Sequence, residues 1–189
     1  MAPEIKTVRH KRRVPIFNQG AIGSCTGNAA AGCLSTAPFK RKCAESDAVE
    51  IYKAATKLDN IPGAYPPNDT GSTGIAVMKA MKNLGWISSY AHTFGLDHTL
   101  RALVLRPGIT GISWRTGCDT PDVQGVVHYS GPIRGGHEVE LVGLDAEAKL
   151  VWFANSWGPK WGKRGYFAMS LDDYGKALAD HGDATFAMP

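Results

Sequence analysis

The sequence contains few cysteines, and their spacing suits neither a cross-linked scaffold nor a metal site. Only four occur among the 189 residues, at Cys25, Cys33, Cys43 and Cys118. They form no Cys-Xaa-Xaa-Cys pair and lack the density of a small secreted disulfide framework. Cysteines and histidines together also fail to form a convincing zinc pattern. We therefore expect no metal and no other cofactor.

Long apolar runs, internal repeats and low-complexity segments are absent as well. No stretch approaches a membrane span, and the start of the chain, Met1 to Lys6, lacks the apolar core of a secretory signal. We therefore expect no membrane partner. The 189 residues, of which 43% are hydrophobic, suit one compact unit over 1–189, or two small lobes sharing a cleft, with a core that needs no disulfides.

Strong charge of one sign is also missing, since the formal net charge is only +4. Much of the excess is local, in a basic cluster formed by Lys6, Arg9, Lys11, Arg12 and Arg13. No aromatic residues interleave with these charges. We therefore favour a solvated basic arm over residues 1–16 and expect no nucleic-acid partner.

Helical signals dominate residues 17–92, the predicted first lobe. Apolar residues recur there at the period of an α-helix, and Pro, Gly, Asn and Asp residues mark 59–73 as a loop. Small polar residues stand where N-caps belong, while Gly and Pro stand where helices end. The expected helices are Cys25 to Ala37 (N-cap Ser24, ended by Pro38), Ser46 to Lys57, and Ile75 to Leu84 (N-cap Thr73 or Ser72, ended by Gly85).

Strand-like runs follow in residues 93–189, the predicted second lobe. A hairpin connection is expected over Asp145 to Lys149. The pattern indicates an α+β fold in which a helical lobe precedes an antiparallel β-rich lobe. The expected elements are a helix over Leu96 to Leu105, strands over Gly108 to Trp114, His137 to Gly143, Leu150 to Ala154 and Tyr166 to Met169, and a closing helix over Leu171 to Ala179 capped by Ser170.

One cysteine stands out because of its surroundings. Cys25 begins the small-residue helix, and Gln19 lies six residues before it. A thiol attacks as its thiolate, and a helix N-terminus or a neighbouring imidazolium lowers its pKa. Downstream, His137 follows two glycines that leave a substrate backbone room to approach, and Asn155 follows a buried-type strand. These residue types are those of a cysteine nucleophile with its base, orienting group and oxyanion donor.

These stretches resemble a papain-like cysteine peptidase, in the short form found in bacteria and bacteriophages. The resemblance is carried by Gln19 to Ala30, Gly71 to Trp86 and Gly136 to Ser170, and the order Gln, Cys, His, Asn agrees with that family. It implies a two-lobe fold with the active-site cleft between the lobes. It also implies hydrolysis of peptide bonds by a Cys-His-Asn triad through a thioester acyl-enzyme, on a protein or peptide substrate. A monomer is expected.

The resemblance implies a role for each matching residue. Cys25 is the nucleophile, His137 the base and Asn155 the acceptor that orients the imidazole, while the Gln19 amide stabilises the oxyanion. The other histidines are interpreted as non-catalytic. The substrate-binding positions that the resemblance implies are Gly71, Ser72, Gly136 and Trp157, the last of which also shields the His137 to Asn155 hydrogen bond.

The sequence departs from the family at several positions. Ile22 stands where many relatives have a disulfide-bonded cysteine, which suggests a reducing compartment, and there is no room before Gln19 for the long inhibitory propeptide of many relatives. We therefore expect a cytoplasmic protein of a bacterial or phage-infected cell, with virion association as the alternative. Ser72 replaces the second of a usual glycine pair, and Thr26 replaces a usual aromatic residue.

Alternative functions remain open at this stage. The same chemistry could act on the peptide stems of cell walls, as in a lytic enzyme. A non-enzymatic binding or assembly module could also be built on an inactive peptidase fold, although such proteins usually lose the nucleophile or the base. Neither alternative is excluded by the residues alone.

Overall fold

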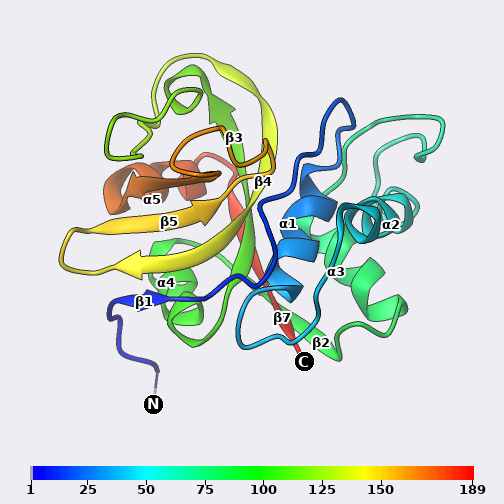
Figure 1. The fold of residues 1–189 in the computed structure, drawn as a ribbon, viewed down its shortest axis with the longest axis horizontal. Helices are drawn as coiled ribbons and strands as arrows, with labels where there is room; N and C mark the ends of the chain where they lie inside the picture. Colours follow the sequence, from blue (N-terminus) through cyan, green and yellow to red (C-terminus); the bar gives the residue numbers. More distant parts are fainter. Residues whose placement is uncertain (1) are drawn as a thin grey trace.

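A seven-stranded antiparallel sheet organises the computed structural model, which describes residues 2–189 (Figure 1). The strands follow the order β2-β7-β3-β4-β5-β6, and β1 pairs with β4 beside this path. Their bounds are β1 Val8–Arg9, β2 Ser89–Thr93, β3 Gly108–Arg115, β4 Ile133–Asp145, β5 Leu150–Ala154, β6 Tyr166–Ser170 and β7 Asp183–Met188. The helices are α1 Cys25–Leu34, α2 Glu45–Ala55, α3 Gly74–Asn83, α4 Leu96–Leu105 and α5 Leu171–Ala179. This mixture of helices and antiparallel sheet confirms the predicted α+β class.

Helices α1, α2 and α3 gather on one side of the molecule around their own apolar core (Figure 1). The Ala- and Gly-rich sequence of α1 lets its neighbours approach closely, since a Cβ added at Gly27 would lie 2.1 Å from the carbonyl oxygen of Ala48 in α2. The predicted cap of α3 is confirmed, because Thr73 Oγ1 accepts a hydrogen bond from the N–H of Ala76. This side supplies the wall that carries Cys25.

The predicted cap of α1 is wrong in one respect. Ser24 occupies the N-cap position, but its side chain makes no capping hydrogen bond to the helix backbone. Instead, the side-chain amide of Asn28 donates to both Ser24 Oγ and Ser24 O. Helix α1 also ends at Leu34, three residues before the predicted end at Ala37.

The second side of the molecule is built on the wide part of the sheet, which packs against α4 and α5. The predicted bounds of α4, β5 and α5 are reproduced, and Ser170 Oγ accepts from the N–H of Asp173 as an N-cap should. Strand β4 is longer than predicted. Strands β1, β2 and β7 were not predicted, and β7 lies between the edge strand β2 and β3.

The basic N-terminal segment is not a solvated arm. It pairs through β1 with Leu144 and Gly143 of β4, and it then crosses the lower part of the molecule toward α1 (Figure 1). Arg9, Lys11 and Arg13 are exposed, whereas Arg12 is turned inward and forms a buried ion pair with Glu140. The alternation explains the error, because every second side chain of an extended segment faces the protein.

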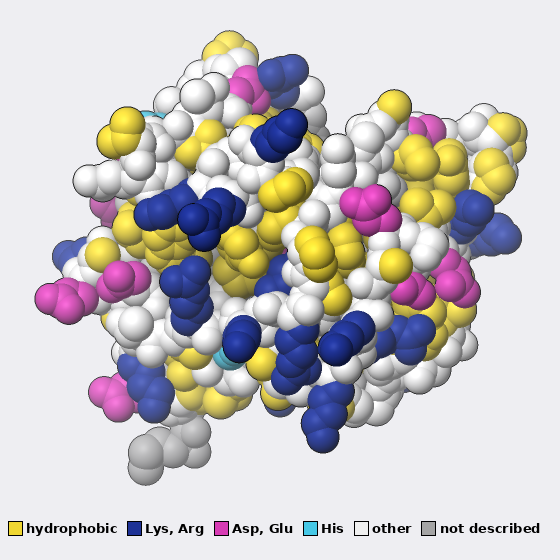
Figure 2. Space-filling model, in the orientation of Figure 1, with side chains coloured by type: hydrophobic (Ala, Val, Ile, Leu, Met, Phe, Trp, Pro, Cys, Tyr) yellow, Lys and Arg dark blue, Asp and Glu magenta, His cyan; other side chains and the backbone are white. Residues whose placement is uncertain are grey.

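Lys and Arg side chains gather across the lower middle of the face seen in the space-filling view (Figure 2). The extended N-terminal segment crosses this region, so its exposed charges coat the surface while its other face packs. None of the helices in residues 2–189 has the length and the apolar composition that a membrane span requires.

Candidate active site

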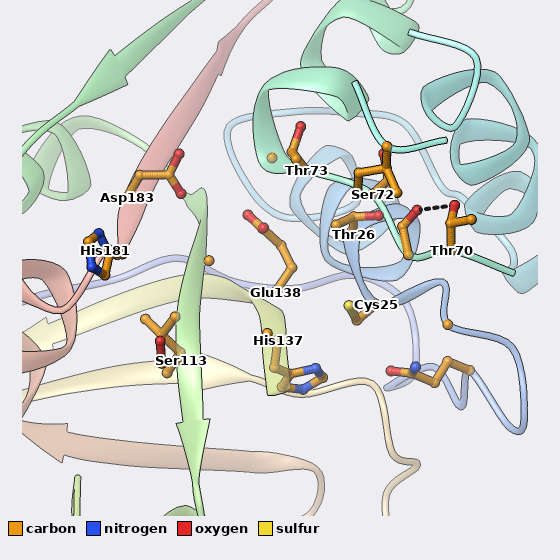
Figure 3. Close-up of a pocket in the computed structure, with 18 of the residues that line it drawn as sticks. Cys25, Thr26, Thr70, Ser72, Thr73, Ser113, His137, Glu138, His181 and Asp183 are labelled. Atoms are coloured by element: carbon orange, nitrogen blue, oxygen red, sulfur yellow. Dashed lines mark hydrogen bonds between the residues drawn. The ribbon is translucent and has the colours of Figure 1, made fainter. Parts of the chain in front are cut away.

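A cleft of about 630 Å³ lies where the helical side meets the sheet. From the helical side it is lined by the start of α1, the loop before α3 and Gln19. From the sheet side it is lined by residues 111–113 of β3, by residues 136–138 of β4 and by Asp183 at the start of β7 (Figure 3). Of the residues predicted for the site, the cleft wall contains Gln19, Cys25, Gly71, Ser72, Gly136, His137 and Trp157.

Cys25 is the first residue of α1, and its side chain faces the part of β4 that carries His137 and Glu138 (Figure 3). The backbone N–H groups of Glu138 and Thr26 hydrogen-bond its sulfur. Because the N-terminal N–H groups of a helix lack partners within the helix, this position favours negative charge on sulfur. Cys25, Cys33, Cys43 and Cys118 are all free thiols.

His137 is fixed by Asn155, which lies behind it and is itself buried. Nε2 of His137 lies 2.8 Å from Asn155 Oδ1, and the backbone N–H of Ser156 donates to the same oxygen, also at 2.8 Å. Since Asn155 Oδ1 can only accept, Nε2 must carry the proton. Nδ1 is therefore the unprotonated nitrogen of the neutral ring.

Two tryptophans hold the imidazole from different directions. Trp157 stacks on His137 with ring centroids 4.8 Å apart, and Trp114 meets it edge-on at 4.9 Å. Trp114 also packs edge-on against Trp157. Only Trp157 was singled out from the sequence. The register of β3 with β4 pairs Ile112 with His137 and Trp114 with Gly135, so Trp114 projects from the same face as His137. The ring of His137 is thereby restricted in orientation and shielded from water.

Burial shifts the pKa values of Cys25 and His137 so that the neutral form of each is favoured. It raises the pKa of the Cys25 thiol to about 11 and lowers the pKa of His137 to about 4. The hydrogen bonds from backbone N–H groups to sulfur and from His137 to Asn155 act in the opposite direction. Each group taken alone is therefore neutral at pH 7. A thiolate in this cleft depends on these hydrogen bonds and on a proton held by the imidazole.

Gln19 is held in place by a residue that the sequence analysis did not select. Ser156 Oγ donates to Gln19 Oε1 at 2.8 Å, and the backbone N–H of Gln19 donates to Ser156 O at 2.9 Å. Gln19 Nε2 donates to Ile22 O at 3.0 Å. The amide group is consequently held in a defined orientation in the wall of the cleft that Cys25 also lines.

The loop before α3 forms the opposite wall. Gly71 has a positive φ of 72°, and its N–H donates to the hydroxyl of Tyr52 at 3.0 Å. Ser72 Oγ donates to Asp59 Oδ2 at 2.6 Å, so its side chain is tied back to the loop.

Three further cleft residues, Glu138, His181 and Asp183, had no assigned role in the sequence analysis. Across residues 2–189, no group of three His, Cys, Asp or Glu side chains is arranged to hold a metal ion.

Comparisons with known proteins agree with this geometry. Residues 121–182, which include His137 and Asn155, match the model described as "Papain family cysteine protease". The chain is 23% identical over 181 residues to the "Viral cathepsin" of Adoxophyes honmai nucleopolyhedrovirus, covering 84% of this chain and 54% of that protein. The chain is thus similar to papain-family cysteine proteases in the part that carries His137 and Asn155.

Other known proteins extend the comparison. "Cathepsin B-like CP3" of Giardia intestinalis is 46% identical over 128 residues, which cover 62% of this chain and 42% of that protein. Xylellain, a cysteine protease from Xylella fastidiosa, superposes with a TM-score of 0.73 at 20% identity, over 96% of this chain and 85% of that chain. The bromelain protease from Ananas comosus gives 0.62 at 17% identity, over 93% of each. These structures share the fold, whereas the matches to the curated relatives span about half of those proteins' length or less.

Proposed function

We propose that this chain is a cysteine endopeptidase that hydrolyses peptide bonds through Cys25, His137, Asn155 and Gln19. The observation that carries the proposal is the 2.8 Å hydrogen bond between His137 Nε2 and Asn155 Oδ1, because His137 lines the same cleft as Cys25. It leaves Nδ1 of His137 free to exchange a proton with the thiol. The similarity of residues 121–182 to the papain family of cysteine proteases supports the same chemistry.

The reaction begins with transfer of the thiol proton from Cys25 to Nδ1 of His137. The sulfur attacks the carbonyl carbon of the scissile bond, and the tetrahedral oxyanion accepts hydrogen bonds from the Gln19 amide and the N–H of Cys25. The imidazolium then gives its proton to the leaving amine, and the C–N bond breaks. A thioester to Cys25 remains, and the amine product departs.

Hydrolysis of the thioester restores the enzyme. Neutral His137 takes a proton from water as the water oxygen attacks the thioester carbonyl, and the sulfur leaves as thiolate. The acid product departs and the sulfur regains its proton from the imidazolium. Asn155 and Trp157 keep the ring oriented throughout, because one accepts from Nε2 and the other stacks on its face.

The test is alkylation of the purified protein with an epoxide that modifies activated thiols, followed by intact mass and peptide mapping. We expect one label per chain, on Cys25, and its loss in His137→Ala. His128→Ala is the matched control, since His128 is exposed and lies outside the cleft. Hydrolysis of an unfolded protein is measured in parallel with hydrolysis of cell-wall peptides.

The outcomes separate the candidate functions. Labelling with cleavage of the protein substrate supports the endopeptidase, and labelling with cleavage of wall peptides alone would redirect the same chemistry to a lytic role. A folded, reduced protein that takes no label at Cys25 would overturn the proposal and favour an inactive binding module.

We also propose that the protein acts as a monomer on protein or peptide chains without a nucleic-acid partner. Size-exclusion chromatography with light scattering tests the first part.

A further inference from the structure

An unpaired carboxyl group lies in the cleft beside the nucleophile. Glu138 follows His137 in β4, and only 5% of the residue is exposed to solvent. Its Oε1 has no hydrogen-bond partner among the described residues. Its side chain points into the cleft from the sheet side, toward the loop that carries Thr73 (Figure 3). A buried polar atom without a partner is costly, so this group calls for an explanation.

The same strand offers a direct contrast. Glu140 lies two residues further along β4, so its side chain is on the same face of the strand. It is also buried, yet it is paired with Arg12 and accepts a hydrogen bond from Thr36 Oγ1. Within residues 2–189, a cation is thus paired with Glu140 and none with Glu138. The difference is that Glu138 opens on the cleft.

A second carboxyl group lies opposite Glu138, and the sheet register explains why. Gly111 of β3 is paired with Glu138 of β4 on one side and with Asp183 of β7 on the other. Directly paired residues project from the same face, so the two acidic side chains flank a glycine, with their Cα atoms about 10 Å apart across two strand spacings. Figure 3 shows both carboxyl groups facing this part of the cleft.

Glycines keep the space around the two carboxyl groups open. A Cβ added at Gly111 would lie 2.9 Å from Glu138 Oε2 and 3.2 Å from Asp183 Oδ1. One added at Gly74, at the start of α3, would lie 2.8 Å from Glu138 Oε1. The other oxygen of Asp183, Oδ2, is 2.7 Å from His92 Nε2, which leaves Oδ1 toward the slot. We call this space, bounded by Glu138, Asp183, Gly111 and Gly74, the acidic slot.

We propose that the acidic slot binds a positively charged side chain of the substrate, with arginine preferred over lysine, and so sets the specificity of the peptidase. The planar guanidinium carries several donors in a fixed fork and can bond two carboxylates at once, whereas an ammonium is a single point of charge. This inference rests on the proposed function. Burial and the nearby Asp183 raise the pKa of Glu138 well above its ordinary value. A bound cation would oppose both effects.

The side of the scissile bond follows from the chemistry at His137. The imidazolium protonates the leaving amine, so the amine product lies on the side of the His137, Trp157 and Trp114 wall. The acidic slot opens into the cleft of Cys25 next to Thr73 and Gly74, whereas Trp114, Trp157 and His137 line a second hollow that contains neither Glu138 nor Asp183. The bound cation therefore belongs to the acyl part of the substrate, N-terminal to the bond that is cut.

The test compares peptides that differ at one position only. Fluorogenic peptides carry arginine, citrulline or lysine at the first, second or third residue before the scissile bond; citrulline has the shape of arginine without its charge. We expect arginine to exceed citrulline in kcat/KM by about tenfold or more at one of these positions. Glu138→Gln should reduce that ratio by a similar factor. Asp183→Asn, which changes the less buried of the two carboxyl groups, should also reduce it.

The design separates this inference from the proposed function. Rates are divided by the concentration of Cys25 that the epoxide labels, so a poorly folded variant does not distort the ratio. Glu147→Gln, in the exposed turn between β4 and β5, is the matched control and should leave the ratio unchanged. Equal rates for arginine and citrulline at all three positions would overturn the acidic slot while leaving the peptidase intact. Absence of both labelling and cleavage would instead overturn the proposed function.

Discussion

The hydrogen bond from Ser156 to Gln19 predicts a graded loss of activity that can be worked out in advance. Ser156→Ala removes only the donor to Gln19 Oε1, at 2.8 Å, because the backbone bonds of Ser156 to Asn155 Oδ1 and to Gln19 N remain. One neutral hydrogen bond is worth about 0.5–1.5 kcal/mol, so kcat should fall roughly 2- to 10-fold. Gln19→Ala removes the proposed oxyanion donor itself, which should lower kcat by about 10²- to 10³-fold.

The double variant tests whether Ser156 acts through Gln19. If the hydroxyl matters only by orienting the amide, Ser156→Ala in the Gln19→Ala background has nothing left to orient, and it should cause no further loss. The assay is kcat under saturating substrate, normalised by labelled Cys25, for wild type, both single variants and the double variant. A full additional loss in the double variant would refute the orienting role. An unchanged kcat for Gln19→Ala would refute the oxyanion role.

Three other changes have defined outcomes. The rate of Cys25 alkylation should fall as the pH drops through about 4, because burial lowers the pKa of His137 to about 4. Below that pH the imidazole is already protonated and cannot accept the thiol proton. The alkylation rate measured as a function of pH tests this. Arg12→Ala should lower the free energy of unfolding by about 3–5 kcal/mol, as measured in urea, since it leaves Glu140 buried without its cation. Gly111→Ala should lower the arginine-to-citrulline ratio severalfold, because its Cβ would force the flanking carboxyl groups to move.

Each of these changes has a control in the same chain. Circular dichroism at each pH separates loss of the reactive pair from acid unfolding, and an alkylation rate that stays constant below pH 4 would contradict the assignment to His137. Arg9→Ala is exposed and should change the unfolding free energy by less than about 0.5 kcal/mol. Gly175→Ala is the control for Gly111→Ala. The added Cβ would lie 3.6 Å from its nearest neighbour, a side-chain atom of Leu96, so the arginine-to-citrulline ratio should stay unchanged in this variant.

The sequence predicts well those elements whose signals are local. Helix α4 begins after a glycine and has a clear apolar period, and α5 has a serine cap, so their bounds are correct. Strand β5 is a short apolar run between turn residues, which is also a local signal. The resemblance carried by the stretches around Cys25, His137 and Asn155 likewise depends on residues close together in the chain.

Features that depend on distant strands could not be predicted in this way. Strand β7 pairs with β3 more than 60 residues earlier in the chain, and its centre is buried, so it has no alternating pattern to mark it. The acidic slot requires the register of three strands at once. The bond between Ser156 and Gln19 joins residues 137 positions apart. None of these pairings leaves a periodic trace in the sequence.

The contrast between Glu138 and Glu140 links stability to specificity along one strand. A buried, unpartnered carboxyl group costs about 1–3 kcal/mol or more, which is a large part of the roughly 5–15 kcal/mol that holds a domain together. For Glu140 this cost is offset within the protein, because Arg12 of the N-terminal segment forms an ion pair with its carboxylate. In Glu138 the corresponding cation would have to come from outside. A substrate arginine would restore in the complex the pairing that the free protein lacks, so its binding energy would be concentrated next to the bond that is cut.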